Sequence, residues 1–212
     1  MIVEERIYRM RPGKAPDYIK GYAQEGLAIQ RPILGNLAGY YSTEIGPLNQ
    51  IIHVWPYQDL EERGRIRAAA VKDGAWPPDT FEFIVGMRSE IMIPFAISPA
   101  LKPGKMGPYF EMRTYTYAPG ALPKIIQVWE KALPARLQFS PLCAAWYSEL
   151  GGLNKFVHIW PYPSLDARND TRSKAQAAGV WPPSAKKLGT PEYQLTAQEN
   201  KILLPASFSP LQ

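Results

Sequence analysis

Alternating apolar and polar residues predict strands at matching places in the two halves of this chain. The first run in each half is rich in Tyr, Thr and Ile, which favour an extended backbone. Two later runs in each half are joined by four residues that include glycine, as in a β-hairpin. The expected strands are residues 5–10, 39–45, 50–55 and 90–93 in the first half and 111–117, 145–150, 155–160 and 201–204 in the second.

Apolar residues at three- and four-residue spacing predict helices between these strands. One such stripe contains Ile125, Trp129 and Leu133. Asp59 and Ser164 are the expected N-caps of the second helix in each half. The expected helices are residues 17–30, 58–72, 122–136 and 164–178, with a shorter one at 81–85.

Five sequence blocks occur twice in the same order, which identifies the two halves as copies of one unit. Arg6-Ile7-Tyr8 recurs as Arg113-Thr114-Tyr115 at an offset of 107 residues (113 − 6), and a Pro-Gly pair follows at the same offset. The Leu-Asn to Trp-Pro-Tyr block and the Trp-Pro-Pro block recur at 105, and a terminal Ser-Pro pair at 111. The first copy therefore has additional residues after its Pro-Gly pair. We expect one of them at Thr43, where it would form a β-bulge in the first copy only.

Each copy has the order β-α-β-β-α-β, the ferredoxin-like unit, whose helices cover one face of a four-stranded sheet. The other face must be buried by a partner. With two copies in one chain, residues 1–100 and 107–212, the simplest arrangement closes both sheets into one barrel, an α+β fold. A further homodimer through helices or sheet edges remains an open alternative.

Composition and charge narrow the class of protein. The chain is 46% apolar and 20% charged, as in ordinary globular proteins. Its net charge of +5 is scattered, and the densest basic group, Arg63, Arg65 and Arg67, is interleaved with acids; we expect a solvated helix face and no nucleic-acid partner. We also expect no secretory signal, no membrane span and no internal disulfide, because Cys143 is the single cysteine. These features favour a cytoplasmic location.

Several of the repeated blocks carry a resemblance to a known family. They are Arg113–Tyr117 with Pro119-Gly120, Trp146–Gly151, Leu153–Tyr162 and Glu199–Pro205. As a set they resemble the NIPSNAP domain, and the second copy is closer to its pattern than the first. The resemblance covers nearly the whole chain, twice. It implies the dimeric α/β-barrel fold, which two chains usually build and which we expect here within one chain.

The resemblance implies little about chemistry. Few activities are assigned within the family, whose eukaryotic members are associated with mitochondria and with vesicle or mitophagy roles. Proteins of the wider superfamily include cofactor-independent monooxygenases, polyketide cyclases and heme-handling enzymes, which share a fold rather than a site. This chain departs from the family pattern at Pro56 and Pro161. Asn200 and Lys201 have no identical counterpart in the first copy, so a role carried by them would not be duplicated.

The two histidines occupy equivalent positions and are the first candidates for a site. His53 shares a strand face with Trp55, and His158 with Trp160, whereas the alternate face of each strand is aliphatic. Because aliphatic residues suit packing against helices, we expect the His and Trp side chains to face the barrel lumen. Imidazole transfers protons near neutral pH, which favours a catalytic acid or base. The alternative is a core histidine bonded to a neighbouring group.

The first strand of each copy adds a cation and a phenol. Arg6 groups with Tyr8, and Arg113 with Tyr115, on one face of the strand. Facing the lumen, Arg would bind the carboxylate of an anionic or aromatic small molecule and Tyr would position an oxygen. The alternative is a structural ion pair with a glutamate of a neighbouring strand.

Glu44 and Glu149 are the glutamates expected near these arginines, as structural partners or as part of the site. Trp76 and Trp181 are expected to anchor loops, and Cys143 to be a buried apolar residue rather than a nucleophile. The sequence contains no phosphate-binding loop, nucleophile elbow or Cys/His metal pattern. We therefore expect neither a metal nor an organic cofactor.

Two functions are compatible with these residues. The first is a cofactor-independent enzyme for a small anionic or aromatic molecule, with His53 or His158 as acid or base. The second is a non-catalytic binding or scaffold protein of the family. An open lumen lined by His, Tyr and Arg favours the enzyme, whereas a packed lumen favours the second function.

Overall fold

Each repeat forms the expected β-α-β-β-α-β unit in the computed structural model, which describes residues 1–74, 81–183 and 195–212. Repeat 1 contains β1 (Ile2–Met10), α1 (Ala15–Gly21), the π-helical turn η1 (Tyr22–Gly26), α2 (Leu27–Leu34), β2 (Gly39–Ile45), β3 (Gln50–Tyr57), α3 (Leu60–Asp73), the 3-10 turn η2 (Phe81–Phe83) and β4 (Ile84–Pro94). Repeat 2 contains β5 (Tyr109–Tyr117), α4 (Leu122–Leu137), β6 (Ala144–Leu150), β7 (Lys155–Tyr162), α5 (Leu165–Ala177) and β8 (Leu195–Pro205).

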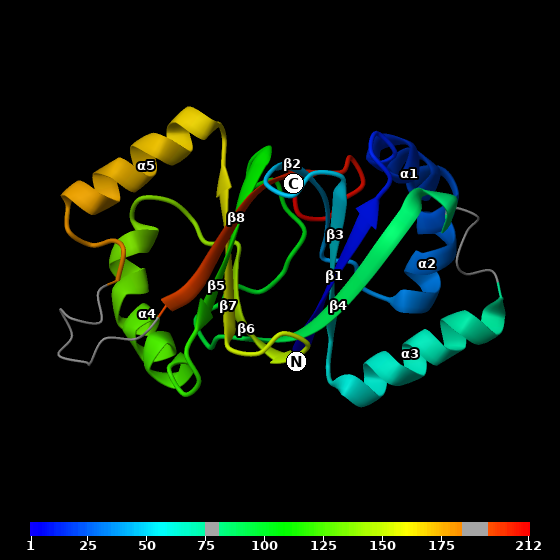
Figure 1. Ribbon diagram of the computed structural model, residues 1–212, viewed down its shortest axis with the longest axis horizontal. Coiled ribbons are helices and arrows are strands. Elements are labelled where there is room, and N and C mark those ends of the chain that lie inside the picture. The colour runs from blue at the N-terminus through cyan, green and yellow to red at the C-terminus, as the bar shows by residue number, and fades with distance from the viewer. Residues whose placement is uncertain (75–80, 184–194) are drawn as a thin grey trace.

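The two sheets close into one barrel with the strand order β1-β3-β2-β8-β5-β7-β6-β4. Antiparallel pairing of β2 with β8 and of β4 with β6 joins the repeats at both edges. Helices α1 to α3 cover the sheet of repeat 1, and α4 and α5 cover the sheet of repeat 2 on the opposite side (Figure 1). The predicted intramolecular barrel is therefore confirmed.

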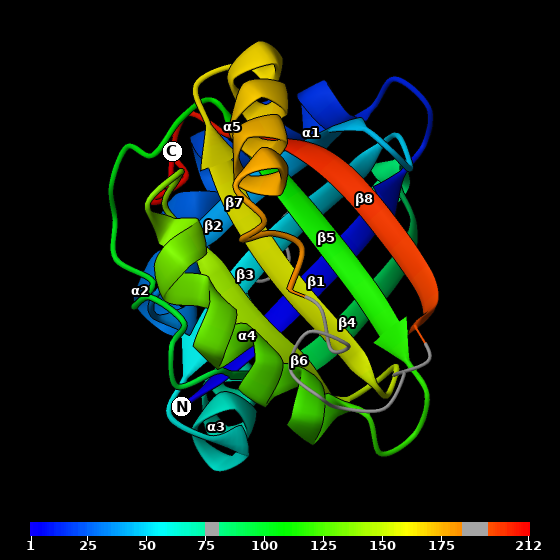
Figure 2. The ribbon, with the colours of Figure 1, turned by 90° about the vertical axis from the view of Figure 1, so that its left-hand side faces the viewer.

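The lumen of the barrel is packed with apolar side chains from both repeats. Aliphatic residues such as Ile52 and Val157 meet aromatic residues such as Phe110 and Trp146 in one buried cluster. Residues 95–108, which connect the two repeats, and the C-terminal residues lie together at one end of the barrel (Figure 2). There Leu101, Met106 and Leu211 pack against this cluster.

Two further cores lie between the sheets and their helices. The helices of repeat 1 cover the sheet with Tyr18 and Tyr22, and α4 covers it in repeat 2 with Trp129. Helices α3 and α5 contribute little to these cores, since their buried residues are Ala70 and Ala175.

Most elements lie where the pattern predicted them, and β4 is the main exception. Residues 81–85 were expected to be helical, but the 3-10 turn ends at Phe83 and Ile84 already pairs with Met10 of β1. β4 and β8 are 11 residues each, much longer than predicted. The first half of β8 is exposed and mostly polar. The first half of β4 exposes apolar residues such as Val85 and Met87, so neither segment shows the apolar and polar alternation on which the prediction relied.

The extra residues of repeat 1 also lie elsewhere than predicted. Tyr40 pairs with His53 as Ala145 pairs with His158, so Thr43 is equivalent to Ser148 and is not an insertion. A bulge occurs in both repeats, at Glu44 opposite β8 and at the equivalent Glu149 opposite β4. The bulge in the first copy is confirmed, but its restriction to that copy was wrong.

The π-helical turn η1 accounts for one additional residue. Tyr22 and Trp129, 107 positions apart (129 − 22), both pack on the sheet, whereas Gly39 and Ala144 are 105 apart (144 − 39). The two additional residues therefore lie between Tyr22 and Gly39. A π turn takes up an extra residue without ending the helix, and such turns are frequent at functional sites.

Candidate functional site

The histidines that we expected in the lumen lie on the opposite face of the sheet, under the helices. The His53 ring lies 4.6 Å from the Tyr8 ring and 5.3 Å from the Tyr40 ring, between ring centroids. The His158 ring lies 4.6 Å from the ring of Trp129 on α4. The prediction was wrong because alternation determines which side chains share a face but not which face is turned inward. The aliphatic face, which contains Ile52, fills the lumen instead.

Each histidine has one hydrogen-bonded ring nitrogen, and Nε2 of both rings is buried without a partner among the described residues. Trp55 Nε1 donates to Nδ1 of His53 at 2.6 Å, and Trp160 Nε1 donates to Nδ1 of His158 at 2.7 Å. The proton of each imidazole is therefore on Nε2. Burial lowers the pKa of both histidines well below its usual value, and Arg6 and Arg113 lower it further. These enclosed, neutral rings match the alternative interpretation of a core histidine.

The arginine and tyrosine of each first strand contact each other as their spacing predicted. Arg6 Nε donates to the Tyr8 hydroxyl at 3.0 Å, and Arg113 Nε donates to the Tyr115 hydroxyl at 2.8 Å. They share the helix-covered face with the histidines. The expected lumen site of His, Trp, Tyr and Arg is therefore assembled in each repeat, but between the sheet and the helices.

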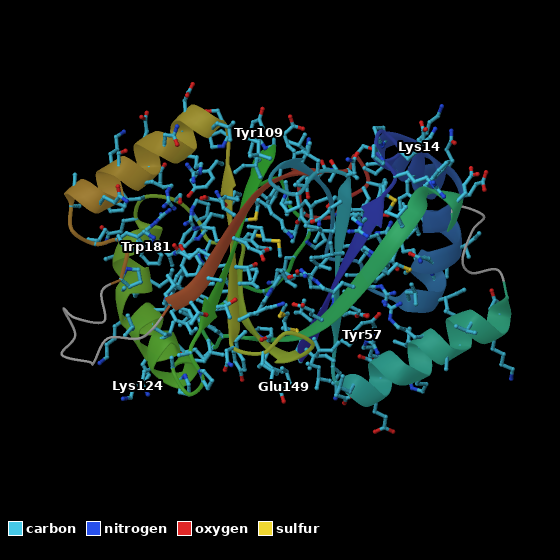
Figure 3. All side chains as sticks on the ribbon, viewed as in Figure 1. Lys14, Tyr57, Tyr109, Lys124, Glu149 and Trp181 are labelled. Carbon is cyan, nitrogen blue, oxygen red and sulfur yellow. The ribbon has the colours of Figure 1, made fainter. Side chains whose placement is uncertain are left out.

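Glu44 and Glu149 are not the partners of these arginines. Both lie at the bulges with exposed side chains, and Figure 3 shows Glu149 at the edge of the molecule beside β6. The arginines pair instead with Glu4 and Glu111, two residues before them on the same strands.

Glu4 is the centre of a charged cluster that the sequence analysis missed. Its fully buried carboxylate accepts hydrogen bonds from Arg6, from Arg63 and Arg67 of α3, and from Ser89 of β4. Burial alone would raise the pKa of Glu4, but these partners outweigh burial and lower it to about 2. Arg63 and Arg67 therefore do not form the solvated face that we expected.

Repeat 2 contains the same cluster. Glu111 pairs with Arg113 at 2.9 Å and with Arg172 at 3.7 Å, and it accepts a hydrogen bond from Arg168 at 2.5 Å. Burial opposes these arginines, yet the pKa of Glu111 is lowered. The internal repeat contained the signal, because the glutamate and its three arginines recur at the offset of their blocks, 107 for the strand and 105 for the helix; Ser89 does not recur, since Asn200 takes its place.

A second group of charged side chains lies inside the barrel. Glu5 and Glu90 face each other across β1 and β4, and Lys155 Nζ lies 2.6 Å from Glu90 Oε1. Burial raises the pKa of Glu5 to about 7, although Lys201 lowers it. Burial also lowers the pKa of Lys201, against the effect of Glu5. The sequence analysis had assigned Glu5 no role, because a lone acid in a strand gives no sign of facing a lumen.

A cleft of about 930 Å³ lies on the sheet of repeat 1, outside the barrel. It lies between α1 with the η1 turn, the bulged end of β2 and the end of β8. Its lining is mainly apolar with several polar side chains. The lining includes Ala15, Ile19, Leu48, Leu204 and Ala206, with Lys20, Gln24, Ser42, Thr43, Glu44 and Asn49 as polar members.

In repeat 2 large side chains occupy the equivalent place. Phe95 N donates to Ala145 O as Ala206 N donates to Tyr40 O, which makes Phe95 the counterpart of Ala206. The Phe95 ring stacks on Phe156 at 4.7 Å with an interplanar angle of 14°. Its centroid is 6.0 Å from that of Tyr147, the counterpart of Ser42.

A third pair of equivalent positions also differs in side-chain size. Leu122, at the start of α4, packs against the helix-side core of repeat 2, and its counterpart at the start of α1 is Ala15. At all three positions the smaller side chain lies on the sheet of repeat 1. One of the three is exchanged between the copies, because Ala206 follows β8 of repeat 2 and Phe95 follows β4 of repeat 1. The cleft therefore results from three reductions in side-chain size, a signal available only once the two copies are aligned correctly.

The remaining candidates have structural surroundings. Trp181 lies beside α4 (Figure 3) with its ring 4.6 Å from that of Trp129, as expected of a loop anchor. Trp76 is outside the described residues. Burial raises the pKa of Cys143 to about 12, which keeps it a thiol in the lumen core. Residues 1–74, 81–183 and 195–212 contain no group of three or more His, Cys, Asp or Glu suited to a metal.

None of the helices described here combines the length and apolar character of a transmembrane segment.

Comparison with known proteins gives a family match in each of the two copies. The NIPSNAP family model matches residues 3–99 and again residues 110–210. Protein NipSnap homolog 3A of Homo sapiens is 28% identical over 216 residues, covering 99% of this chain and 85% of that protein. A putative monooxygenase from Lactobacillus acidophilus has a similar fold, with a TM-score of 0.61 at 9% identity over 97% of this chain and 94% of that one. A putative monooxygenase from Fusobacterium nucleatum gives 0.61 at 11% identity, over 97% and 92%.

Proposed function

The chain belongs to the NIPSNAP family, and from this premise we propose that it binds a small organic molecule in the cleft of repeat 1. The observation that carries the proposal is the difference between the repeats. Phe95, Tyr147 and Leu122 fill the site in repeat 2, and smaller residues leave it open in repeat 1. A cavity of this size is within the range of ligand sites, where an apolar floor and a few polar groups are usual.

The interior of the barrel supports binding rather than the acid–base chemistry expected of the histidines. The lumen is packed, and both imidazoles are enclosed, neutral and bonded to tryptophan. No proton transfer is assigned to them. The putative monooxygenases share only the fold with this chain, and no oxygen chemistry is proposed on that basis.

Filling the cleft tests the proposal. Ala206→Phe with Ser42→Tyr introduces into the cleft the side chains that the equivalent place on the other side of the barrel already accommodates. With anilinonaphthalene sulfonate as a fluorescent probe, we expect saturable binding of one molecule per wild-type chain and its loss in this variant. Fluorescence titration measures both, and thermal unfolding checks that the variant is folded.

Two further variants provide a control and a converse test of probe binding. Ala68→Phe adds the same ring on the exposed side of α3 and should leave binding unchanged. Phe95→Ala with Tyr147→Ser opens the equivalent place in repeat 2 and should add a second binding site. A folded, cleft-filled variant that binds the probe like the wild type would rule out this function, as would a wild-type chain without saturable binding.

A further inference from the structure

We propose that each repeat also carries a site for a phosphate group, formed by three arginines around one buried glutamate. In repeat 1 the site consists of Arg6, Arg63 and Arg67 around Glu4. In repeat 2 it consists of Arg113, Arg168 and Arg172 around Glu111. Each lies between the outer face of the sheet and α3 or α5. None of these residues lines the cleft, so the inference is independent of the proposed function.

Each cluster contains more positive than negative charge. Three guanidinium groups and one carboxylate leave a net charge of about +2. Among the described residues, Arg63 and Arg67 form ion pairs only with Glu4, and Arg168 and Arg172 only with Glu111. The positive potential also contributes to the lowered pKa of His53, on which Arg6 and Arg67 act. Such a cluster attracts an anion.

Hydrogen-bond donors are also in excess. Glu4 accepts from Arg6 Nη1 at 2.8 Å, Arg63 Nη2 at 2.7 Å, Arg67 Nε at 2.8 Å and Ser89 Oγ at 2.6 Å. A carboxylate offers about four lone-pair sites, so Glu4 is close to its capacity. The remaining N–H groups need other acceptors.

The same donor is left over in both repeats. Nε of Arg63 is buried and has no hydrogen-bond partner within the described residues. Nε of its counterpart Arg168 is in the same situation. An unpaired buried donor is costly, and its recurrence at equivalent positions points to a common acceptor that binds there.

A small solute can reach these arginines. Their side chains are between 15% and 25% exposed, whereas both glutamates are fully buried. The adjacent helices do not seal the sites with apolar packing, since α3 buries Ala70 and α5 buries Ala175. The glutamate therefore forms the floor of each site and the arginines its accessible wall.

A phosphate group fits this chemistry better than a single carboxylate. A phosphomonoester carries about −1.5 to −2 charges near neutral pH, which matches the excess charge of each cluster. Its three oxygens accept hydrogen bonds from several directions, and the planar guanidinium group presents paired donors suited to them.

Calorimetric titration of the full chain with inorganic phosphate tests the proposal, at an ionic strength held constant with sodium chloride. We expect two phosphates per wild-type chain, one for Arg67→Gln or Arg172→Gln, and none for the double variant. Arg65→Gln is the matched control, because Arg65 is an exposed arginine of the same helix, and it should retain two. Titration with glycerol phosphate separates the sources: binding at least as tight as that of phosphate indicates a phosphomonoester ligand, and weaker binding indicates free phosphate.

Hydrogen exchange of the wild-type chain keeps the test decisive if an arginine variant does not fold. Phosphate should protect backbone amides of α3 and α5 but not those of α1. No saturable phosphate binding by the wild type, or equal stoichiometry in wild type and the folded double variant, would overturn the proposal. Protection of α1 to the same extent as α3 would also count against it.

Discussion

At the scale of single residues, Glu5 has an unusual environment for a carboxylic acid. It lies inside the barrel, opposite Glu90 across the strand pair, and burial raises its pKa to about 7. The unfolded chain has an ordinary glutamate there, with a pKa of 4.5. The folded state therefore disfavours the charged form. This penalty is absent below about pH 4.5 and complete above about pH 7.

We predict that Glu5→Gln stabilises the protein selectively at high pH. Relative to wild type, its unfolding free energy should rise by on the order of 3 kcal/mol between pH 4.5 and pH 8, since one pKa unit corresponds to about 1.4 kcal/mol. Urea unfolding at the two pH values measures this. Glu149→Gln changes an exposed glutamate and should show no such trend. Parallel pH dependence in wild type and Glu5→Gln would contradict the prediction.

At the residue scale, the sequence predicted which side chains share a face of a strand but not which face points into the lumen. Period-two alternation correctly grouped Arg6 with Tyr8 and His53 with Trp55, because neighbouring strand residues point to opposite sides. Which group faces the lumen depends on what covers each side. Here the helices present aromatic rings such as Trp129, which pack on histidine, and the opposing sheet presents aliphatic side chains. No residue of the strand itself carries that information.

At the scale of elements, α3 and α5 are held differently from the other helices. Each buries a single alanine side chain, so apolar packing contributes little to their attachment. The ion pairs from Arg63 and Arg67 to Glu4 connect α3 to the sheet, and the equivalent pairs to Glu111 connect α5. These helices should be the first elements to open.

We predict that Glu4→Gln loosens α3 without loosening α1. The lowered pKa of Glu4 corresponds to a stabilisation on the order of 3 kcal/mol, present above about pH 4.5 and lost as the pH falls through about 2. Hydrogen exchange in Glu4→Gln at pH 7 should therefore be faster in residues 60–73 than in wild type. Glu61→Gln, an exposed change in the same helix, is the control. Unchanged exchange in α3 would show that other contacts hold it.

Element boundaries were predictable where the pattern of residues was regular. β2 begins and ends at the expected residues, and Asp59 and Ser164 cap their helices through side-chain hydrogen bonds to Glu62 N and Ala167 N. The first half of β4 was missed because backbone pairing with β1 holds it while apolar residues such as Val85 and Met87 stay exposed, so the side-chain pattern does not indicate a strand with one buried face. The π turn was missed for a related reason, since one added residue leaves the apolar stripe nearly intact.

At the scale of the whole molecule, the two repeats contribute opposite charges to one lumen. Repeat 1 supplies Glu5 and Glu90, and repeat 2 supplies Lys155 and Lys201. Two copies of repeat 1 would bring four carboxylates together, and two copies of repeat 2 would bring four ammonium groups together. Like charges gathered in a buried space are strongly unfavourable, and in repeat 1 the only cation paired with these carboxylates among the described residues is Arg88, whose side chain is half exposed.

We predict that separated halves, residues 1–100 and 107–212, associate with each other rather than with themselves. Native mass spectrometry of the co-refolded halves should show the mixed dimer in large excess over either homodimer. Replacing both Glu5 and Glu90 by Gln in the first half should increase its self-association, because the repulsion is removed. Predominant homodimers from unmodified halves would be inconsistent with charge as the source of selectivity.

The cleft is open on one side of the barrel and filled on the other, a difference that is possible because one chain forms both sides. In a barrel built from two identical chains, every substitution appears on both sides, so opening one cavity also opens its twin and weakens the core twice. In a single polypeptide, a substitution changes only one side of the barrel. One side of the barrel can lose core volume to accommodate a ligand, while Phe95 and Tyr147, one from each repeat, keep the other side filled; a symmetric pair of identical chains cannot differ in this way.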